Sequence, residues 1–368
     1  GYTKFMAAVN KAAAKARRER FGKKTTKKKE EEDWDSLPEM KDEARHEQWC
    51  ERISLDVWQS NVRRFSNAAL VIREYHVHDD ESKSRISSVE RNFINMLKSS
   101  RFCAEGPIVE NVIKGFNVMA DALEISASEP VLSHQIQEIV LDRSSLEEVL
   151  SFRLAEKLTF LSHWEYHLED VFLEAMHSDP AIGKAIRRDI TAIQERDPAC
   201  VNLITPLLYY KGFKAITCHR VSHWLWEKGR RHLAQHLQSL TSEFFAVDIH
   251  PAAEIGSGIL LDHATGFVAG ETSRVADDVS ILHAVTLGGT GKEKGDRHPK
   301  IGRGVLIGAG AKILGNIVVG DCSRIGANSV VLEDIPPHAT VVGVPARVIS
   351  AETGDDPALR MDHNVGCG

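Results

Sequence analysis

The sequence lacks several features that would indicate whole classes of protein. No run approaches the roughly 18 apolar residues that a membrane-spanning helix needs, and this argues against a membrane protein. Six cysteines are scattered through 368 residues without a Cys-x-x-Cys pair, which argues against a zinc ribbon or a disulfide scaffold and favours a reducing compartment. The net charge of −6 is mild and argues against nucleic-acid binding by the whole protein. The length suffices for two or three domains.

Residues 1–45 differ in composition from the rest of the chain. Ten Lys or Arg and one acid, Glu19, lie between Lys11 and Lys29. Such a segment is typical of a charged, disordered extension. An Ala- and Arg-rich segment that is poor in acids is also typical of organelle targeting. We expect a cytoplasmic location. The basic N-terminal segment makes a chloroplast or a mitochondrion the alternative. Residues 46–140 show a weak helical pattern without a defined domain.

A clear helical domain is predicted over residues 141–246. Ser145-Leu-Glu-Glu148 is a capping box, and aliphatic residues follow it at helical spacing. A second helix is predicted to begin at Asp179-Pro180, a cap residue followed by proline in the first turn. It ends at Asp197-Pro198, because the residue before proline disfavours helix. Further helices are expected at residues 212–228 and 230–245, separated by Gly229.

From about Val247 the hydrophobic pattern changes to a period of six. An aliphatic residue occupies every sixth position from Ile301 to Val331. This period is typical of a coil of three short strands per turn, with one aliphatic residue pointing inward at each corner. The coil is expected to span residues 247–349, with a flexible polar tail at 350–368. The series is Ile301, Ile307, Ile313, Val319, Ile325 and Val331.

Parts of the coil carry charge or imidazole where a structural coil needs only small residues. They include Asp248, His263 and an insertion at residues 288–300 that interrupts the period. Insertions in a solenoid form loops, and loops often carry function. Histidine suits general-base chemistry because its pKa lies near neutral pH. A single histidine in a coil often only fills a surface turn. His263 stands out because Asp248, Asp262 and the basic loop can converge near it.

The stretch from about residue 146 to 349 resembles the serine acetyltransferases, enzymes of cysteine biosynthesis. The six-residue period alone would indicate only an acyltransferase or a carbonic-anhydrase-like relative. The resemblance implies an α+β fold, in which an all-helical domain precedes a left-handed parallel β-helix of hexapeptide repeats. It also implies a homotrimer or a dimer of trimers, with sites between subunits. The matching strings include Arg196-Asp-Pro-Ala199, Pro206-Leu-Leu-Tyr-Tyr-Lys-Gly-Phe213, Asp248-Ile-His-Pro-Ala-Ala253, Leu261-Asp-His-Ala-Thr-Gly266 and Gly295-Asp-Arg-His-Pro-Lys300.

The resemblance implies transfer of acetyl from acetyl-CoA to the hydroxyl of L-serine, with no metal. It assigns His263 as the general base and Asp248 as the carboxylate that orients it. Asp262 is a poor orienting group, because adjacent residues of an extended segment point to opposite sides. The residues implied for holding zwitterionic serine are Asp197 and Asp262 for its ammonium, and Arg297 with His298 for its carboxylate.

Acetyl-CoA needs a groove rather than a phosphate-cradling motif. Small residues would let its pantetheine arm lie against the backbone, and extended coils packed between subunits would supply the groove. Lys312 would meet phosphates, although a solvated face accounts for it equally well. The residues predicted to contact acetyl-CoA are Gly288, Gly289, Ala309, Ala327 and Lys312.

Two alternatives stay open from the sequence. One is the same fold acting on homoserine or a sugar, and the other is a non-catalytic scaffold that binds a partner enzyme. L-Cysteine is expected to inhibit, because it is serine with sulfur in place of oxygen. The chain ends Met361-Asp-His-Asn-Val-Gly-Cys-Gly368, without the terminal isoleucine by which many members dock into O-acetylserine sulfhydrylase. The sequence therefore does not support that complex, and no nucleic-acid or membrane partner is expected.

Overall fold

The computed structural model describes residues 118, 121–143, 145–159, 167–291, 294–350 and 356–361. These residues belong to two compact units. In the first unit the structure describes α5 (Ser133–Ile136) and the π-helix η2 (Gln137–Leu141). The second unit contains a helix at residues 121–128 and the described chain from Leu146 onward. The expected extension at 1–45 and most of that at 46–140 lie outside the described residues.

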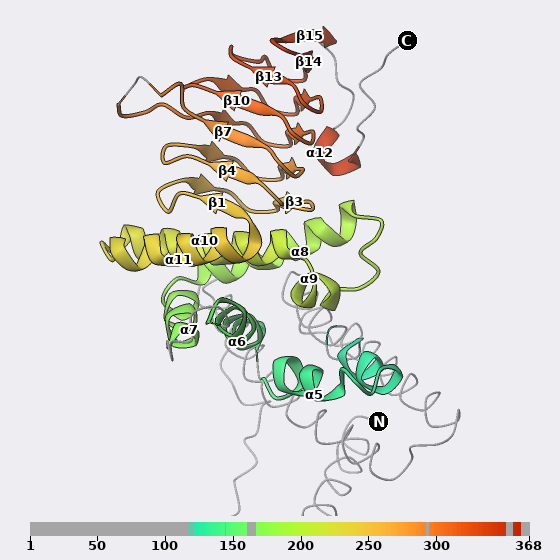
Figure 1. Cartoon of the computed structure of the whole chain (residues 1–368). Coiled ribbons are helices and arrows are strands. Elements are labelled where there is room, and N and C mark those ends of the chain that lie inside the picture. The colour runs from blue at the N-terminus through green and yellow to red at the C-terminus, as the bar shows by residue number, and fades with distance from the viewer. Residues whose placement is uncertain are drawn as a thin grey trace, which may run out of the picture. The chain divides into compact units, whose positions relative to one another are not determined.

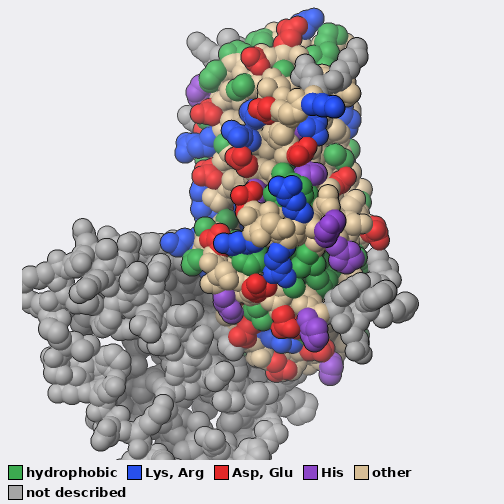
Figure 2. Space-filling model, turned by 90° about the vertical axis from the view of Figure 1, so that its left-hand side faces the viewer, with side chains coloured by type: hydrophobic (Ala, Val, Ile, Leu, Met, Phe, Trp, Pro, Cys, Tyr) green, Lys and Arg blue, Asp and Glu red, His purple; other side chains and the backbone are tan. Residues whose placement is uncertain are grey.

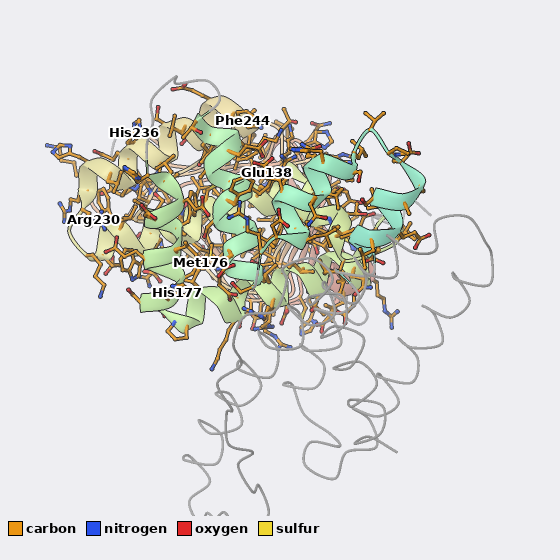
Figure 3. All side chains as sticks on the ribbon, turned by 90° about the horizontal axis from the view of Figure 1, so that it is seen from below. Glu138, Met176, His177, Arg230, His236 and Phe244 are labelled. Carbon is orange, nitrogen blue, oxygen red and sulfur yellow. The ribbon has the colours of Figure 1, made fainter. Side chains whose placement is uncertain are left out.

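In the second unit the helices form layers against one end of the coil (Figure 1). The helices are α6 (Leu146–Thr159), α7 (Leu168–Ser178), α8 (Pro180–Arg196), α9 (Ile204–Leu208), α10 (Lys211–Glu227) and α11 (Arg231–Phe245). Figure 3 shows the helices from the side opposite the coil and labels Arg230. The Arg230 guanidinium, just before residue 231 where α11 begins, pairs with Glu174 of α7 at 2.8 Å.

The helix boundaries confirm the signals in the sequence. Asp179 caps α8, where its Oδ1 accepts a hydrogen bond from the Ala181 N–H at 3.0 Å. Helix α8 then ends at Arg196, with Asp197 as its C-cap residue ahead of Pro198. Gly229 separates α10 from α11 with a φ of +75°, a left-handed conformation that favours glycine. The short helices α7 and α9 were not predicted.

The coil is a parallel solenoid whose strands form three sheets, here called faces A, B and C. Face A contains β1 (Val247–Ile249), β4 (Phe267–Ala269), β7 (Thr286–Gly288), β10 (Lys312–Leu314) and β13 (Val330–Val331). Face B contains β2 (Glu254–Ile255), β5 (Arg274–Val275), β8 (Lys300–Ile301) and β11 (Val318–Val319). Face C contains β3 (Leu260–Leu261), β6 (Ser280–Ile281), β9 (Leu306–Ile307), β12 (Arg324–Ile325), β14 (Thr340–Gly343) and the antiparallel β15 (Ala346–Ser350).

The period-six residues form the interior of the coil. On face C, Leu261 is in register with Ile281, and Ile281 with Ile307. All three side chains are at most 4 % exposed, and burying each one stabilises the fold by about 1.5–3 kcal/mol. The predicted helical domain followed by a parallel β-helix of hexapeptide repeats is therefore confirmed. The left-handed winding of the coil is implied by the resemblance and stays a prediction. The strand register is the same for a left-handed and a right-handed coil.

Buried ionic contacts fasten the helices to the first turn of the coil. The Arg220 guanidinium of α10 and the Asp189 carboxylate of α8 pair at 2.6 Å and are both buried. Asp189 Oδ1 also accepts from the Ile259 N–H at 2.9 Å, and Arg220 Nη2 donates to the Gly256 carbonyl at 2.7 Å. Because each charge is paired and hydrogen-bonded, its burial is tolerated. Helix α8, whose C-cap residue is Asp197, is thus fixed relative to the coil.

One segment of the expected flexible tail packs against the coil. Ala358, in α12 (Pro357–Arg360), is 0 % exposed, and its carbonyl accepts from Ser280 Oγ at 2.9 Å. Asp356 Oδ1 accepts from Cys322 Sγ at 2.7 Å. Residues 356–361 of the predicted tail therefore contact the coil, and the flexibility of the tail stays a prediction.

Candidate active site

The first candidate group lies in the corner between β3 and β4, residues 262–266, called here the histidine corner. His263 and Ala264 have φ of +54° and +59°, a left-handed region that non-glycine residues rarely adopt. The side chain of His263 is 73 % exposed, and its Nε2 lies 3.7 Å from Asp262 Oδ2. The expectation that Asp262 points away from His263 is wrong, because this corner is left-handed and not extended.

The edge of the coil above His263 continues through successive turns. The His263 ring meets His283 edge-on, with centroids 5.8 Å apart. The Gly310 N–H donates to the His283 carbonyl at 2.9 Å, and the Asn328 N–H donates to the Ala309 carbonyl at 2.8 Å. Two of the residues predicted to contact acetyl-CoA, Ala309 and Ala327, therefore lie on the same edge as His263.

Asp248 lies on β1, near the C-terminal end of α11. Its Oδ1 accepts a hydrogen bond from Gln238 Nε2 at 2.7 Å. Both Asp248 and His263 are among the described residues, and the structure forms no direct hydrogen bond or ion pair between them. The predicted Asp248–His263 dyad therefore stays a prediction. Gln238, which the sequence analysis did not single out, holds one carboxylate oxygen of Asp248.

Asp197 and Asp262 come from different parts of the chain and both act on Tyr210. Burial raises the pKa of the Tyr210 hydroxyl, and hydrogen bonding to Asp197 and the charges of Asp197 and Asp262 raise it further. Asp197 is thus hydrogen-bonded to the Tyr210 hydroxyl, and Asp262 acts on the same hydroxyl through its charge. Asp197 Oδ1 also accepts from the Ala199 N–H at 2.8 Å. The sequence analysis missed Tyr210, because a tyrosine beside a helix start reads as ordinary packing.

The second candidate group lies in the loop between β7 and β8, residues 288–299, called here the arginine loop. Arg297 Nη2 donates to Glu271 Oε2 at 2.8 Å, and Arg297 Nη1 donates to the Gly295 carbonyl at 3.0 Å. The hydrogen bond from Arg297 lowers the pKa of the Glu271 carboxyl, and the positive charge of Arg297 lowers it further. Burial raises this pKa but does not outweigh them. The guanidinium is therefore oriented by its own chain. Glu271 carries no motif by which the sequence would reveal it.

His298 is held from the turn below by Thr272. Thr272 Oγ1 accepts from the N–H groups of Arg297 and His298 at 3.0 and 3.1 Å, and the Thr272 N–H donates to His298 Nδ1 at 3.2 Å. A Cβ on Gly270 would lie 2.0 Å from His298 Nε2, so glycine is needed there for the ring to fit. Burial lowers the pKa of His298, and the Arg297 charge lowers it further. The neutral imidazole is thus favoured.

The two candidate groups lie on different edges of the coil. The histidine corner joins face C to face A, whereas the arginine loop joins face A to face B. One chain therefore places Asp262 beside His263, and separately holds Arg297 and His298 on Thr272. The residues predicted for acetyl-CoA divide likewise. Gly288 and Gly289 lie at the arginine loop, and Lys312 lies on face A, where its Nζ donates to the Ala284 carbonyl.

The described residues contain no group of three or more His, Cys, Asp or Glu side chains that could hold a metal ion. None of their helices is long and apolar enough to cross a membrane. On the face of the coil seen in Figure 2, Lys and Arg side chains are interspersed with Asp and Glu.

Comparison with known proteins identifies the family. A model described as "Serine acetyltransferase, N-terminal" matches residues 116–218, and one for bacterial transferase hexapeptides matches residues 298–333. The serine acetyltransferase of Salmonella typhimurium is 50 % identical over 258 residues, which cover 70 % of this chain and 94 % of that protein. This chain belongs to the serine acetyltransferase family. The resemblance inferred from the motifs is confirmed.

Solved structures of serine acetyltransferases share the fold. One in complex with cysteine is 49 % identical, with a TM-score of 0.67 over 69 % of this chain and 99 % of the other. One from Brucella abortus in complex with coenzyme A is 49 % identical, with a TM-score of 0.65 over 69 % and 99 %. One from Neisseria gonorrhoeae in complex with serine is 50 % identical, with a TM-score of 0.62 over 64 % and 96 %.

Proposed function

We propose that this protein transfers the acetyl group of acetyl-CoA to the hydroxyl of L-serine. The products are O-acetyl-L-serine and free CoA, and the reaction is the first step of cysteine biosynthesis from serine. The observation that carries the proposal is 50 % identity across 94 % of a serine acetyltransferase. The relatives bound to coenzyme A and to serine support the choice of substrates.

His263 acts as the general base in this proposal. A serine hydroxyl is a poor nucleophile at neutral pH, so its proton must leave as the oxygen attacks the thioester carbonyl. An imidazole that is 73 % exposed on an edge of the coil is accessible to a bound substrate. When the tetrahedral intermediate collapses, the carbon–sulfur bond breaks and the imidazolium returns the proton to the departing thiolate. The step is balanced without a metal or another reactant.

Asp248 orients the imidazole of His263 through its second ring nitrogen. A carboxylate in this position holds the ring in one tautomer and stabilises the imidazolium that forms. Gln238 binds only Oδ1 of Asp248, which leaves Oδ2 as an acceptor.

The serine zwitterion is held by charges from two copies of the chain. Asp197 and Asp262 bind its ammonium at the histidine corner, while Arg297 and His298 bind its carboxylate. The two sets lie on different edges of one coil, so a neighbouring copy must supply the second set. A cyclic homotrimer repeats this contact three times and closes it. A homotrimer, or a dimer of trimers joined through the helices, is therefore part of the proposal.

Acetyl-CoA lies along the edge above His263, between neighbouring coils. Ala309 and Ala327 leave room there for the pantetheine arm, and the arginine-loop glycines Gly288 and Gly289 do the same on the facing copy. Lys312 would turn from the Ala284 carbonyl toward the phosphates. L-Cysteine, which differs from serine by one atom, occupies the serine site and inhibits, as the cysteine-bound relative supports.

Release of free CoA thiol from acetyl-CoA tests the proposal. We expect turnover with L-serine by the wild type and a loss of roughly 10²–10⁴-fold in His263→Ala, the range for losing a general base. His177→Ala, at an exposed histidine on α7, serves as the matched control and should keep full activity. Turnover with homoserine but not serine would favour another acceptor. No turnover with either would favour a scaffold, and full activity of His263→Ala would reject the base.

A further inference from the structure

The start of α10 lies unusually close to the histidine corner. A Cβ on Gly212 would lie only 1.9 Å from the Leu261 carbonyl oxygen and 3.2 Å from Ala264 Cβ. Any side chain there would collide with backbone, which cannot rotate away as a flexible side chain does. Glycine at 212 therefore permits a close approach of helix to coil that no other residue allows.

Lys211, the first residue of α10, reaches the other end of the same corner. Its Nζ donates a hydrogen bond to Thr265 Oγ1. Thr265 is in turn joined to His263, because its N–H donates to the His263 carbonyl at 2.7 Å and its hydroxyl lies 3.4 Å from that oxygen. Gly212 thus touches the chain on both sides of His263, and Lys211 holds the residue that hydrogen-bonds the histidine backbone.

The backbone at His263 is the part of the coil that most needs such support. Among the described residues, His263 and Ala264 form the only pair of adjacent non-glycine residues with left-handed φ. The corners at Asp278, Ala284 and Asn328 each have a single such residue. A residue with a Cβ adopts this conformation at a cost in energy, and it persists only where its surroundings enforce it. The contacts of Lys211 and Gly212 enforce it here from outside the coil.

We propose that Lys211 and Gly212 are positioning residues for His263. The start of α10 clamps the histidine corner at Leu261, Ala264 and Thr265 and so fixes the direction in which the imidazole leaves the coil. Neither residue touches the reacting atoms. The inference rests on the proposed function, since it requires His263 to be the base.

Lys211→Met tests the clamp, because methionine keeps most of the length of the side chain but cannot donate to Thr265. We expect kcat with serine to fall about tenfold, part of the roughly hundredfold loss that a 1 Å misplacement can cause, with KM for acetyl-CoA unchanged. Thr265→Val, which keeps the shape and removes the acceptor, should show the same loss. Lys211→Arg and Thr265→Ser keep the hydrogen bond and should recover most of the rate. Lys228→Met, at the opposite end of the same helix, is the control and should behave as wild type.

Two combined variants separate positioning from general damage. Lys211→Met/Thr265→Val should lose no more kcat than either single variant, because both remove one contact. Adding Lys211→Met to His263→Ala should leave the residual rate unchanged, since no base remains to be positioned. The inference would be overturned if Lys211→Met and Thr265→Val both kept the wild-type kcat. A further tenfold loss of kcat when Lys211→Met is added to His263→Ala would also overturn it. The wild-type assay with serine tests the proposed function separately, so failure of one is distinguishable from failure of the other.

Discussion

The histidine corner and the arginine loop are edges of the same coil, yet they are held in different ways. The arginine loop is braced from within the coil, by Thr272 and Glu271 on the turn below. The histidine corner is contacted from outside, by Lys211 and the closely packed α10. The comparison indicates that a hexapeptide coil can brace a long loop by itself. A left-handed corner of two non-glycine residues is supported by a second structural element.

The largest expected effect that separates the two edges is on serine binding through the arginine loop. Arg297→Ala should raise KM for serine by roughly 10–100-fold, because a charge-assisted hydrogen bond is worth about 1.5–3 kcal/mol. The value of kcat at saturating serine and KM for acetyl-CoA should change little. Arg303→Ala, on another edge of the coil, is the control. A drop in kcat with unchanged KM for serine would show that Arg297 acts in the chemical step, and would contradict its role in binding serine.

A smaller effect is expected from the brace within the coil. Thr272→Val removes the oxygen that accepts from the backbone of Arg297 and His298 while keeping the side-chain shape. We expect KM for serine to rise about fivefold to tenfold, the cost of roughly 1 kcal/mol for a lost hydrogen bond, with kcat retained. Thr272→Ser should restore wild-type KM. Steady-state kinetics with varied serine measure this. Equal KM values for serine in Thr272→Val and Thr272→Ser would show that the Thr272 oxygen does not brace the loop.

The smallest effect concerns acid stability where the helices meet the coil. His219 of α10 is 4 % exposed and its Nε2 meets the Ala253 carbonyl at 3.1 Å. Burial lowers its pKa well below the usual value, and His223 and Arg220 lower it further. In the unfolded chain the ring is protonated first, so the stability present above about pH 6.5 is lost as pH falls toward the folded pKa, by at most about 1.4 kcal/mol per pH unit.

His219→Gln keeps a donor for the Ala253 carbonyl and removes this titration. Urea unfolding between pH 7 and pH 5 should therefore show a shallower loss of unfolding free energy in His219→Gln than in wild type. His177→Gln, at an exposed site, should keep the wild-type slope. Identical slopes for all three proteins would show that the junction of α10 with the coil does not set the acid response.

The sequence predicted those parts of the molecule that depend on local rules. The six-residue period fixed which residues point inward, and cap residues such as Asp179 predicted where helices begin. It could not predict contacts that depend on the backbone of a corner. Asp262 and His263 were expected to diverge, but the left-handed turn brings them to 3.7 Å. Gly212 became informative only when α10 was seen against the corner, because its neighbours Leu261 and Ala264 are distant in sequence.

In the proposed oligomer, one copy supplies His263 to a site and a neighbouring copy supplies Arg297. Co-expression of a His263→Ala chain and an Arg297→Ala chain with different tags, followed by purification through both tags, tests it directly at low serine. Each variant alone should be nearly inactive. In the mixed oligomer roughly a quarter to a third of the sites combine an intact corner with an intact loop, and that fraction of wild-type activity should return. A purified mixed oligomer as inactive as its parents would contradict the account.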